Sequence, residues 1–538
     1  MNFENQQKPC LIQTGQGFSV KYKEKFLYSK YDPKKNILQK IDGMNFLPGT
    51  VVLCMSPLLC YGIKELISKL PENCHVLLCE RDIELKKMTE EAVSENKFSS
   101  QCSLLSEDEL FNLPVILQKS EYEFSDGTKL CEAGTYKRVV RIDFSAGVQF
   151  YADFYNELEV SCVNSVKQFW ANRFTLVKFG RRYSKNVFEN LRTLPYTKKL
   201  EDYIGKIKKP IVVLGAGETS ETGAEIIKNC REKYFVLCAD TAFSFLLGHK
   251  IIPDGIVIDE AQSIIAQSFL GIGKIVKKQN EFQKVQVFQS LCSLPHVCGK
   301  NFPLEQITFY GTEYASNQFF ENLKSQSFFP PVIPPFGSVG ITAFFLAHLF
   351  KENENIPVTS YGLDFAYSKG KTHANGTPAH KRMLRQMSRV KNAENFGACF
   401  GENVISLPKE NCLCSGNQKL IYSTPILQSY ANTFNSLSKN INVFVSDWLK
   451  DYGAMKKKTE IDVSRFFETE RQNLLELKGV LSGEIVLSED ERNRRIFEIC
   501  RNRDYLFLHF PDGYKFNLSL GFLKRVRATT EFFLKIFK

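Results

Sequence analysis

The polar stretch from residue 362 to residue 375, GLDFAYSKGKTHAN, carries the side chains of this sequence that are best suited to chemistry. The side chain of His373 gains or loses a proton near neutral pH, and Asp364 and Tyr367 are common companions of such a proton carrier. We therefore expect a functional role for this loop, although a single histidine can also be structural or merely exposed. The other residues of the stretch that we include in the candidate site are Gly362, Lys371, Thr372 and Asn375.

The turn GAGETS, residues 215–220, follows the apolar run Ile211–Leu214 and leads into an expected helix. Glycine allows the backbone to come close to an anion, and the first turn of a helix presents unpaired N–H groups, so this turn could hold a phosphate. The third glycine of the GxGxxG pattern is replaced by Ser220, and a GxxxxGK[ST] pattern is absent. A tight turn that serves only the fold is the competing interpretation. The candidate residues are Gly215, Gly217, Glu218, Thr219 and Ser220.

Two carboxylates follow the next apolar runs of the chain. Asp240, with Thr241, comes after YFVLC, and Asp259 comes after DGIVI. A carboxylate at the end of a strand can bind ribose hydroxyls, hold Mg²⁺ or cap the next helix, and capping alone explains either residue. A second glycine turn comes before the apolar helix ITAFFLAHLF and is another candidate anion cradle. Its candidate residues are Gly337, Ser338 and Gly340.

All these segments come directly after apolar runs or at the start of an expected helix. From residue 210 onward, the runs IVVLG, YFVLCAD, GIVIDE, VQVFQS, QITFYG and PVTSYGLD have helical patterns between most of them. This alternation predicts an α/β domain with a doubly wound, Rossmann-like and mostly parallel sheet. Ligands of such sheets bind beyond the carboxyl ends of the strands, so we expect the candidate residues to form one nucleotide pocket at one edge.

The rest of the chain predicts two further parts. The N-terminal segment has a strand at 50–55, a helix at 62–70 and a strand at 75–79, followed by a long helical stretch at about 150–191. Beyond residue 455 the sequence is rich in helical patterns. We therefore predict an N-terminal α/β domain over 1–195, a central domain over 196–454 and a helical C-terminal appendage over 455–538.

Composition excludes several classes of protein. The net charge of +11 is spread over short basic clusters such as KRMLRQMSRVK, whereas a nucleic-acid footprint is usually more concentrated, so we expect no nucleic-acid partner. No apolar stretch reaches the ~20 residues that cross a bilayer, and the N-terminus lacks the pattern of a secretory signal, so we expect a cytoplasmic protein without stable membrane insertion. Cys412 and Cys414 lack the second pair of ligands that a zinc site needs. Neither a GxSxG nor an HExxH motif is present.

Taken together, VLGAGETS, ADTAFSFLLGHKIIPDGIVIDEAQ, FGSVGITAFFLAHLF and SYGLDFAYSKGKTHANGT resemble the motifs of the motility-associated factor (Maf) glycosyltransferases, in the same order. The central domain of that family is also named 6-hydroxymethylpterin diphosphokinase MptE-like. SPLLCYGIKELISKLP and FGRRYSKNVFENL resemble segments that lie upstream in the same proteins. The resemblance covers residues 50–450, and where family members often have a Pro-Ser pair this chain has ETS.

The resemblance implies a bacterial cytoplasmic enzyme whose central domain is similar to bacterial sialyltransferases. Such an enzyme transfers a nonulosonic, sialic-acid-like sugar from a CMP-activated donor to Ser or Thr of flagellin and supports motility. The nucleotide sugar and the protein acceptor would be its partners. His373 or Asp364 would act as the base, and Tyr367 or Lys371 would stabilise the phosphate. The other candidate residues would bind the nucleotide sugar.

Two alternatives stay open. The first is an Mg²⁺-ATP-dependent diphosphokinase of the kind that gives the domain its name, in which Asp240 and Asp259 would hold the metal, with Glu260 in place of a fuller aspartate cluster. No cofactor other than this Mg²⁺ is expected. The second is a non-enzymatic protein that keeps the fold and binds partners in flagellar or surface assembly.

Overall fold

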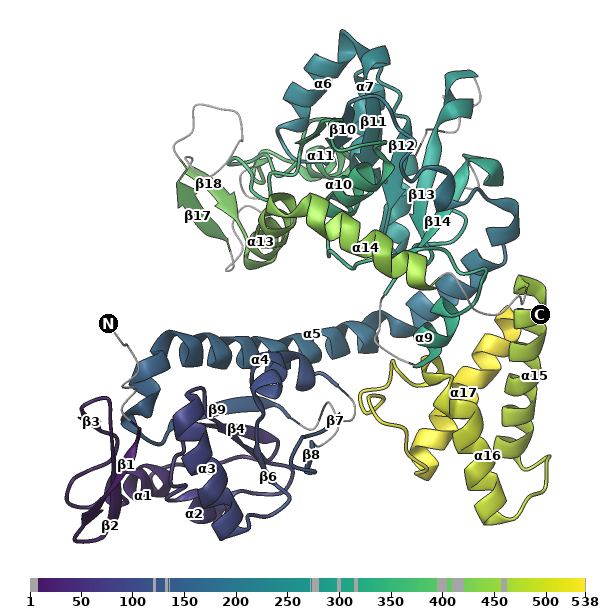
Figure 1. Ribbon diagram of the computed structural model, residues 1–538. Coiled ribbons are helices and arrows are strands. Elements are labelled where there is room, and N and C mark those ends of the chain that lie inside the picture. Colours follow the sequence, from purple (N-terminus) through teal and green to yellow (C-terminus); the bar gives the residue numbers. More distant parts are fainter. Residues whose placement is uncertain are drawn as a thin grey trace. The chain divides into compact units, whose positions relative to one another are not determined.

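The computed structural model divides into two compact units, Met1–Val177 and Lys178–Lys538, and each is described by itself (Figure 1). The break falls inside the long helix α5 (Ala152–Leu191). The division into three domains at 195 and 454 therefore stays a prediction. The structure describes residues 8–119, 122–130, 134, 136–270, 272, 280–297, 301–313, 318–393, 404–408, 420–455 and 462–537.

The first unit is built on a parallel sheet with the strand order β6-β5-β4-β9. Every residue of β4 and β5 is buried, which explains why continuous apolar runs predict them. The expected strand-helix-strand unit at 50–79 is confirmed by β4, α2 and β5. The elements are β1 (Cys10–Thr14), β2 (Gly17–Tyr22), β3 (Lys25–Phe26), α1 (Lys35–Asp42), β4 (Thr50–Met55), α2 (Ile63–Lys69), β5 (His75–Cys79), α3 (Ile83–Asn96), β6 (Cys102–Leu104), α4 (Glu107–Ile116), β7 (Tyr122–Glu123), β8 (Lys129–Leu130) and β9 (Arg138–Asp143).

The second unit contains a seven-stranded sheet with the order β15-β14-β13-β12-β11-β10-β16, and all its neighbouring strands are parallel. The expected parallel α/β sheet is thereby confirmed. The two-residue strand β15 was not expected. The strands are β10 (Ile211–Leu214), β11 (Phe235–Ala239), β12 (Gly255–Ile258), β13 (Gln286–Ser290), β14 (Ile307–Thr312), β15 (Val332–Ile333) and β16 (Val358–Tyr361).

The chain order places a topological switch between β10 and β16. From β10 the strands proceed outward through β11 to β15, and the chain then returns to add β16 on the other side of β10. The apolar helix α10 (Val339–Phe350) contacts β10, β11, β12 and β16, and it is buried at nearly every position. Helix α7 (Asp240–Gly248) starts directly at the end of β11, and helix α6 (Ser220–Lys228) follows β10 after the glycine turn. A crevice at the carboxyl ends of β10 and β16 is therefore the expected place for a ligand.

The C-terminal part of this unit is helical, as the sequence predicts. Its helices pack on the end of α5 through an aromatic cluster in which Phe188 contacts Phe319, Tyr505 and Phe537. None of the described helices is both long and apolar enough to cross a membrane. The remaining elements are α9 (Gln318–Lys324), α11 (Pro378–Gln386), β17 (Ile405–Pro408), β18 (Leu420–Ser423), α13 (Pro425–Lys439), α14 (Ile441–Met455), α15 (Val463–Ser482), α16 (Glu489–Arg501) and α17 (Leu520–Ile536).

Candidate functional site

The turns after β10 and β16 are joined by direct hydrogen bonds. The backbone N–H of Thr219 donates to Oδ2 of Asp364 at 3.0 Å, and the Thr219 hydroxyl donates to Oδ1 of the same carboxylate. The Thr219 hydroxyl also accepts the N–H of Gly362 at 2.7 Å. Two predicted segments that are far apart in the sequence therefore meet at the switch point, as expected. Asp364 therefore accepts hydrogen bonds from donors at the start of α6 that we expected to bind a phosphate.

The glycines of these turns are required by close backbone contacts. A Cβ on Gly215 would lie 2.3 Å from the carbonyl oxygen of Gly362, and a Cβ on Gly217 would lie 2.4 Å from Oδ2 of Asp364. Gly362 has a φ of +72°, and a Cβ there would lie 2.0 Å from the hydroxyl of Ser220. The Ser220 hydroxyl donates to the carbonyl of Gly215 at 2.7 Å. These residues thus form a closely packed junction in which no room remains for a side chain.

The loop after β16 is tied to α6 by a small group of charges. Lys371 forms ion pairs with Glu218 at 3.4 Å and with Glu221 at 2.8 Å. Glu221 also accepts the backbone N–H of Asn375 at 2.8 Å, and Glu218 accepts the hydroxyl of Ser368 at 2.6 Å. Burial opposes the charge on Glu221, but the bonds from Asn375 and Lys371 prevail and lower its pKa. The amine of Lys371 is therefore already engaged by two carboxylates.

His373 lies in the same loop and is held beside the glycine turn. Its neighbour Ala374 donates its N–H to the carbonyl of Ala216 at 2.9 Å, and Ser244 of α7 donates to the carbonyl of Gly376 at 3.2 Å. The Nδ1 atom of His373 lies 3.1 Å from the hydroxyl of Thr372. Burial lowers the pKa of the imidazole, and the positive charge of Arg382 adds to that effect. Both effects favour the neutral form of the imidazole.

Asp240 and Asp259 lie at the ends of the neighbouring strands β11 and β12. Asp240 is 2% exposed, and burial followed by the charges of Asp259 and Glu260 raises its pKa to about 7. Its carboxylate accepts the N–H of Thr241. Asp259 accepts hydroxyl groups from Tyr310 at 2.6 Å and Thr342 at 2.8 Å, yet burial still raises its pKa. The buried carboxyl group of Asp240 thus lies close enough to the partly buried Asp259 to be influenced by its charge.

The second glycine turn lies at the start of α10. Ser338 holds the N-cap position, but its side chain makes no capping bond. Gly337 has a φ of +78°, and a Cβ on Gly340 would lie 2.3 Å from the side chain of Leu363. Gly340 therefore permits α10 to pack against the end of β16. The first turn of α10 is also joined to the end of β12, through the hydrogen bond from Thr342 to Asp259.

Tyr367 is buried and contacts the β17–β18 pair. It is 4% exposed, its backbone exchanges two hydrogen bonds of 2.9 Å with Tyr422 of β18, and the two rings are stacked. These contacts fix the loop that carries His373 against the β17–β18 pair. A direct role for the phenol in catalysis stays a prediction.

Sequence reasoning missed several residues that build this edge. Asn186 donates its side-chain amide to the carbonyls of Cys292, at 2.9 Å, and Ala261, while Asn190 does the same for Leu291 and Ser293. Both asparagines are 2% exposed and lie one turn apart on α5. They hold the loops that follow β12 and β13. The only signal in the sequence is two amides with helical spacing at the end of a long helix. The other residues missed are Ser368, Glu221, Tyr310 and Thr342.

Metal binding has no preformed geometry here. No group of three or more His, Cys, Asp or Glu residues that could hold a metal ion occurs within the described parts of the chain. Cys412 and Cys414 lie outside those parts. Glu260, the third carboxylate near Asp240, accepts the N–H of Gln262 at 2.8 Å and so caps its own turn.

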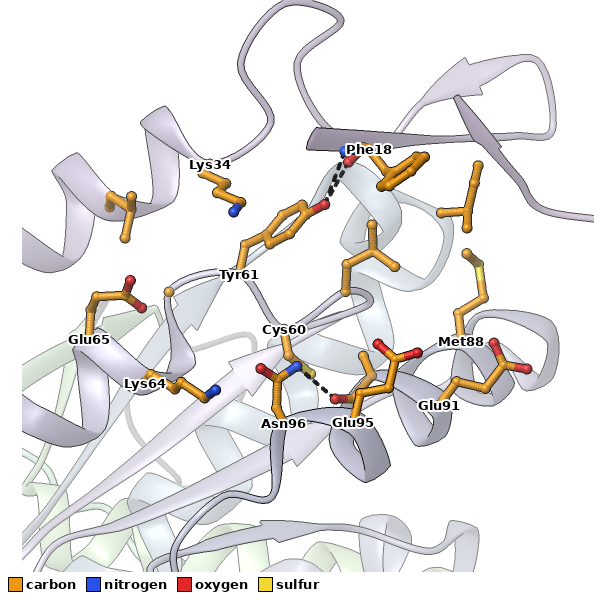
Figure 2. A pocket seen from close by; sticks show the side chains of 15 residues that line it. Phe18, Lys34, Cys60, Tyr61, Lys64, Glu65, Met88, Glu91, Glu95 and Asn96 are labelled. Atoms are coloured by element: carbon orange, nitrogen blue, oxygen red, sulfur yellow. Dashed lines mark hydrogen bonds between the residues drawn. The ribbon is translucent and has the colours of Figure 1, made fainter. Parts of the chain in front are cut away.

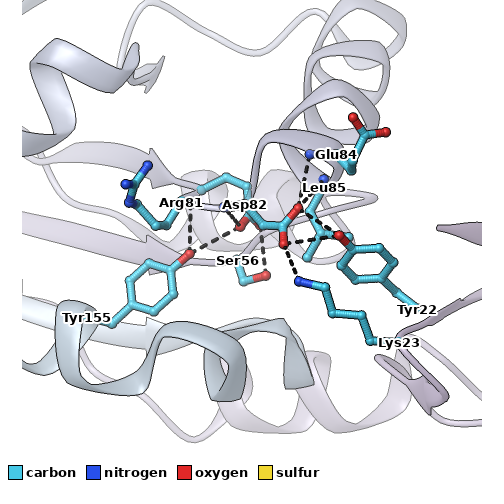
Figure 3. A network of polar contacts seen from close by, with 9 residues as sticks. Tyr22, Lys23, Ser56, Arg81, Asp82, Glu84, Leu85 and Tyr155 are labelled. Carbon is cyan, nitrogen blue, oxygen red and sulfur yellow. Dashed lines mark hydrogen bonds and ion pairs between the residues drawn. The ribbon is translucent and has the colours of Figure 1, made fainter. Parts of the chain in front are cut away.

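The first unit has a polar network of its own at the ends of β4 and β5 (Figure 3). Glu80, 3% exposed, accepts hydroxyl groups from Ser56 at 2.8 Å and Tyr155 at 3.2 Å. Burial raises the pKa of Glu80 to about 7. Asp82 accepts hydrogen bonds from the N–H groups at the start of α3 and forms an ion pair with Lys23 at 3.1 Å. Both carboxylates are thus satisfied by neighbours, so this network explains the packing of the unit.

A cavity of about 470 Å³ in the same unit is lined by residues of β1, β2, α1, α2 and α3 (Figure 2). Tyr61 reaches across it, and the phenol both accepts the N–H of Phe18 at 3.2 Å and donates to its carbonyl at 3.0 Å. Charged side chains of both signs, Lys34, Glu91 and Glu95 among them, line the rest. This cavity contains none of the predicted site residues. The candidate site is therefore the carboxyl edge of the seven-stranded sheet.

The part of the chain that forms this edge matches a known protein family. Residues 181–370 match the family described as 6-hydroxymethylpterin diphosphokinase MptE-like. The matched range includes β10 to β16, both glycine turns, Asp240, Asp259 and Asp364, and it ends just before His373. Over 576 aligned residues the chain is 27% identical to an "uncharacterized protein" of Treponema pallidum (strain Nichols). That match covers 98% of this chain and 95% of the relative, so it runs through both units.

Proposed function

We propose that the protein is a transferase that binds a nucleotide-activated substrate at the carboxyl edge of the seven-stranded sheet. Within that class, we propose a glycosyltransferase of the Maf kind, which transfers a nonulosonic sugar from a CMP-activated donor to Ser or Thr of flagellin in the cytoplasm. Its central domain would be similar to those of bacterial sialyltransferases. The likeness of the strand-end motifs to that family supports the choice of donor and acceptor.

One observation carries the proposal: the turn after β10 and the loop after β16 meet at the topological switch, with His373 held beside them through the Ala374–Ala216 bond. Crevices of this kind are where parallel α/β sheets bind nucleotides. A neutral imidazole has to lie at such a crevice if it is to accept a proton from an acceptor hydroxyl. In His373, Nδ1 is near Thr372, and Nε2 has no hydrogen bond within the described residues.

In the proposed reaction the hydroxyl oxygen of the acceptor forms a bond to the anomeric carbon of the sugar. The bond between that carbon and the phosphate oxygen of the donor breaks, and CMP leaves with the electron pair. Nε2 of His373 takes the proton of the acceptor hydroxyl. The carboxylate of Asp364 holds the two turns together through Thr219 and acts as a positioning group. The side-chain amide of Asn375, exposed and without a bond in the described chain, is available to the donor.

A second candidate function is supported by a different observation. The family that matches residues 181–370 is described by a diphosphokinase activity, and the carboxylates of Asp240 and Asp259 end neighbouring strands and interact electrostatically. Transfer of a diphosphate from ATP needs Mg²⁺ to neutralise phosphate charge. Asp240 and Asp259 would hold that ion if this candidate is right. The ion would then lower the pKa of both carboxyl groups.

A thermal-shift screen with CMP, UDP, ATP and ATP plus Mg²⁺ tests both candidates, because a ligand that binds the native state alone raises its apparent stability. A ligand at 100 times its Kd adds about 2.7 kcal/mol to the free energy of unfolding. The glycosyltransferase predicts stabilisation by CMP, and the diphosphokinase predicts stabilisation by ATP that requires Mg²⁺. The matched pair His373→Ala and Asp240→Asn then separates them, since only the second change should abolish a metal-dependent shift. Absence of any shift would favour a binding protein without enzymatic activity.

A further inference from the structure

Helix α11 and the turn after it carry exposed basic side chains that form no ion pair with a described residue. Lys381, Arg382, Arg385 and Arg389 are all exposed. Through their side chains they make no ion pair or hydrogen bond within the part of the chain that is described. Lys381 and Arg385 are four residues apart and Arg382 and Arg385 are three apart, spacings at which like charges on a helix repel each other. The first turn of α11 contains no acidic residue that would relieve this repulsion.

This helix starts where the candidate site ends. Thr377 caps α11 by accepting the N–H of His380 at 3.3 Å, and the preceding loop is bonded to the glycine turn and to α7. The start of α11 is therefore fixed to the carboxyl edge of the sheet. The charge of Arg382 lowers the pKa of His373, so this side chain of α11 lies near the loop of the candidate site.

The interior of the site is acidic. It contains Glu218, Glu221, Asp240, Asp259 and Asp364, and Lys371 is the cation that pairs with two of them in the described structure. The net charge of these six side chains stays negative even when Asp240 is protonated. A phosphate that approaches this edge is therefore repelled by the floor of the site. Positive charges that attract the phosphate therefore have to come from the margin of the site, where α11 begins.

We propose that α11 forms an anion-binding wall of the candidate site, and that Lys381, Arg382 and Arg385 receive the phosphate of the nucleotide ligand. The inference rests on the proposed function and adds the part of the site that recognises phosphate. Because these side chains are exposed, their attraction for phosphate is strong at low ionic strength and screened at high ionic strength. The Debye length falls from about 30 Å at 0.01 M salt to about 3 Å at 1 M.

The test compares the full-length protein with Lys381→Gln/Arg385→Gln and with the control Arg471→Gln/Arg494→Gln. The control removes two exposed positive charges from α15 and α16, so the change in net charge is the same. Calorimetry measures the Kd of CMP and of inorganic pyrophosphate at both salt concentrations, and thermal unfolding verifies that each variant is folded. We expect the α11 variant to bind CMP about tenfold more weakly at about 0.01 M salt and less than about twofold more weakly at about 1 M. The control should bind as the wild type does.

The outcomes separate the inference from the function on which it rests. Binding of CMP that is equally tight in the α11 variant and the wild type at low salt overturns the anion-binding wall and leaves the proposed function intact. Binding of pyrophosphate that depends on α11, without binding of CMP, supports the wall and contradicts the choice of nucleotide. A wild-type protein that binds neither probe overturns the inference.

Discussion

The carboxylate of Asp364 accepts both the backbone N–H of Thr219, at 3.0 Å, and the hydroxyl of the same residue. One side chain at the end of β16 therefore fixes the start of α6, which follows β10. An internal anion occupies part of the position where helix starts bind phosphate in other parallel sheets. The site around His373 depends on this contact for its shape.

Removing that carboxylate should destabilise the protein before it affects any chemistry. Asp364→Ala leaves the N–H and hydroxyl of Thr219 buried without an acceptor, which costs about 2–4 kcal/mol of unfolding free energy. Asp364→Asn keeps one acceptor oxygen and should cost less. Urea unfolding of the two variants measures the difference. If Asp364→Ala is as stable as the wild type but inactive, the carboxylate acts on the substrate.

Alanine in place of the glycines at this junction should be poorly tolerated. Gly217→Ala places a Cβ 2.4 Å from the carboxylate of Asp364, and Gly362→Ala combines a φ of +72° with a contact of 2.0 Å. We expect each to lose about 2–3 kcal/mol of stability. Gly248→Ala at the end of α7 is the control, since a Cβ there meets no heavy atom within 4 Å. Equal midpoints of thermal unfolding for Gly217→Ala and Gly248→Ala would contradict the close packing.

The strands of the central sheet could be predicted because each is a continuous apolar run that is visible in the sequence itself. Every residue of β10 and β12 is buried, so their apolar runs stand out in the sequence. The two-residue β15 is too short to give such a signal. The parallel order also places the strand ends at one edge, which is why the glycine turn and the loop around His373 could be expected to meet.

The partners within the site could not be predicted in this way. Glu218 and Lys371 are an acid and a base about 150 positions apart, and only the fold decides that they pair. The sequence equally allowed Asp364 to face a substrate or, as found, to bond Thr219. Asn186 and Asn190 bond to backbone carbonyls, which leave no trace in a sequence.

These two asparagines should matter for the site although they touch none of its predicted residues. Asn186→Ala removes the donor to one carbonyl after β12 and one after β13, and Asn190→Ala removes the donor to two carbonyls after β13, so each should cost about 1–3 kcal/mol. Asn172→Ala, an exposed position on the same helix, should change stability by less than about 0.5 kcal/mol. Chemical denaturation at pH 7 gives these values. Loss of less than about 0.5 kcal/mol at position 186 would show that the loops do not need this support.

Replacing Asp240 by its neutral isostere should stabilise the folded protein at neutral and alkaline pH. The folded pKa of about 7 lies above the ordinary value of 3.8, so the native state holds this proton more tightly than the unfolded chain. That contribution is complete below the ordinary pKa and is lost as the pH rises toward the folded pKa, so stability falls between about pH 4 and 7. Asp240→Asn removes this loss and should gain on the order of 1–4 kcal/mol at pH 8.

Thermal unfolding of Asp240→Asn and the wild type between pH 4 and 8 measures how stability changes with pH. Glu225→Gln, at an exposed position on α6, is the control and should leave the pH dependence unchanged. The same slope in Asp240→Asn and the wild type would mean that the carboxyl group ionises freely. A gain in stability together with a loss of ligand binding would indicate that the buried charge is kept for function.

The pH dependence of transfer should report the protonation of His373. Burial and the charge of Arg382 lower the pKa of this imidazole below its ordinary 6.5. The neutral base therefore persists above pH 7, and activity should decline only when the pH falls through that lowered pKa. His373→Ala should reduce kcat about 10²–10⁴-fold and remove the acid limb of the profile. Arg382→Gln removes a positive charge that lowers this pKa and should therefore move the acid limb toward higher pH. Arg471→Gln, at an exposed position on α15, is the control and should leave the limb in place. An acid limb that is unchanged in His373→Ala would assign the base to another group.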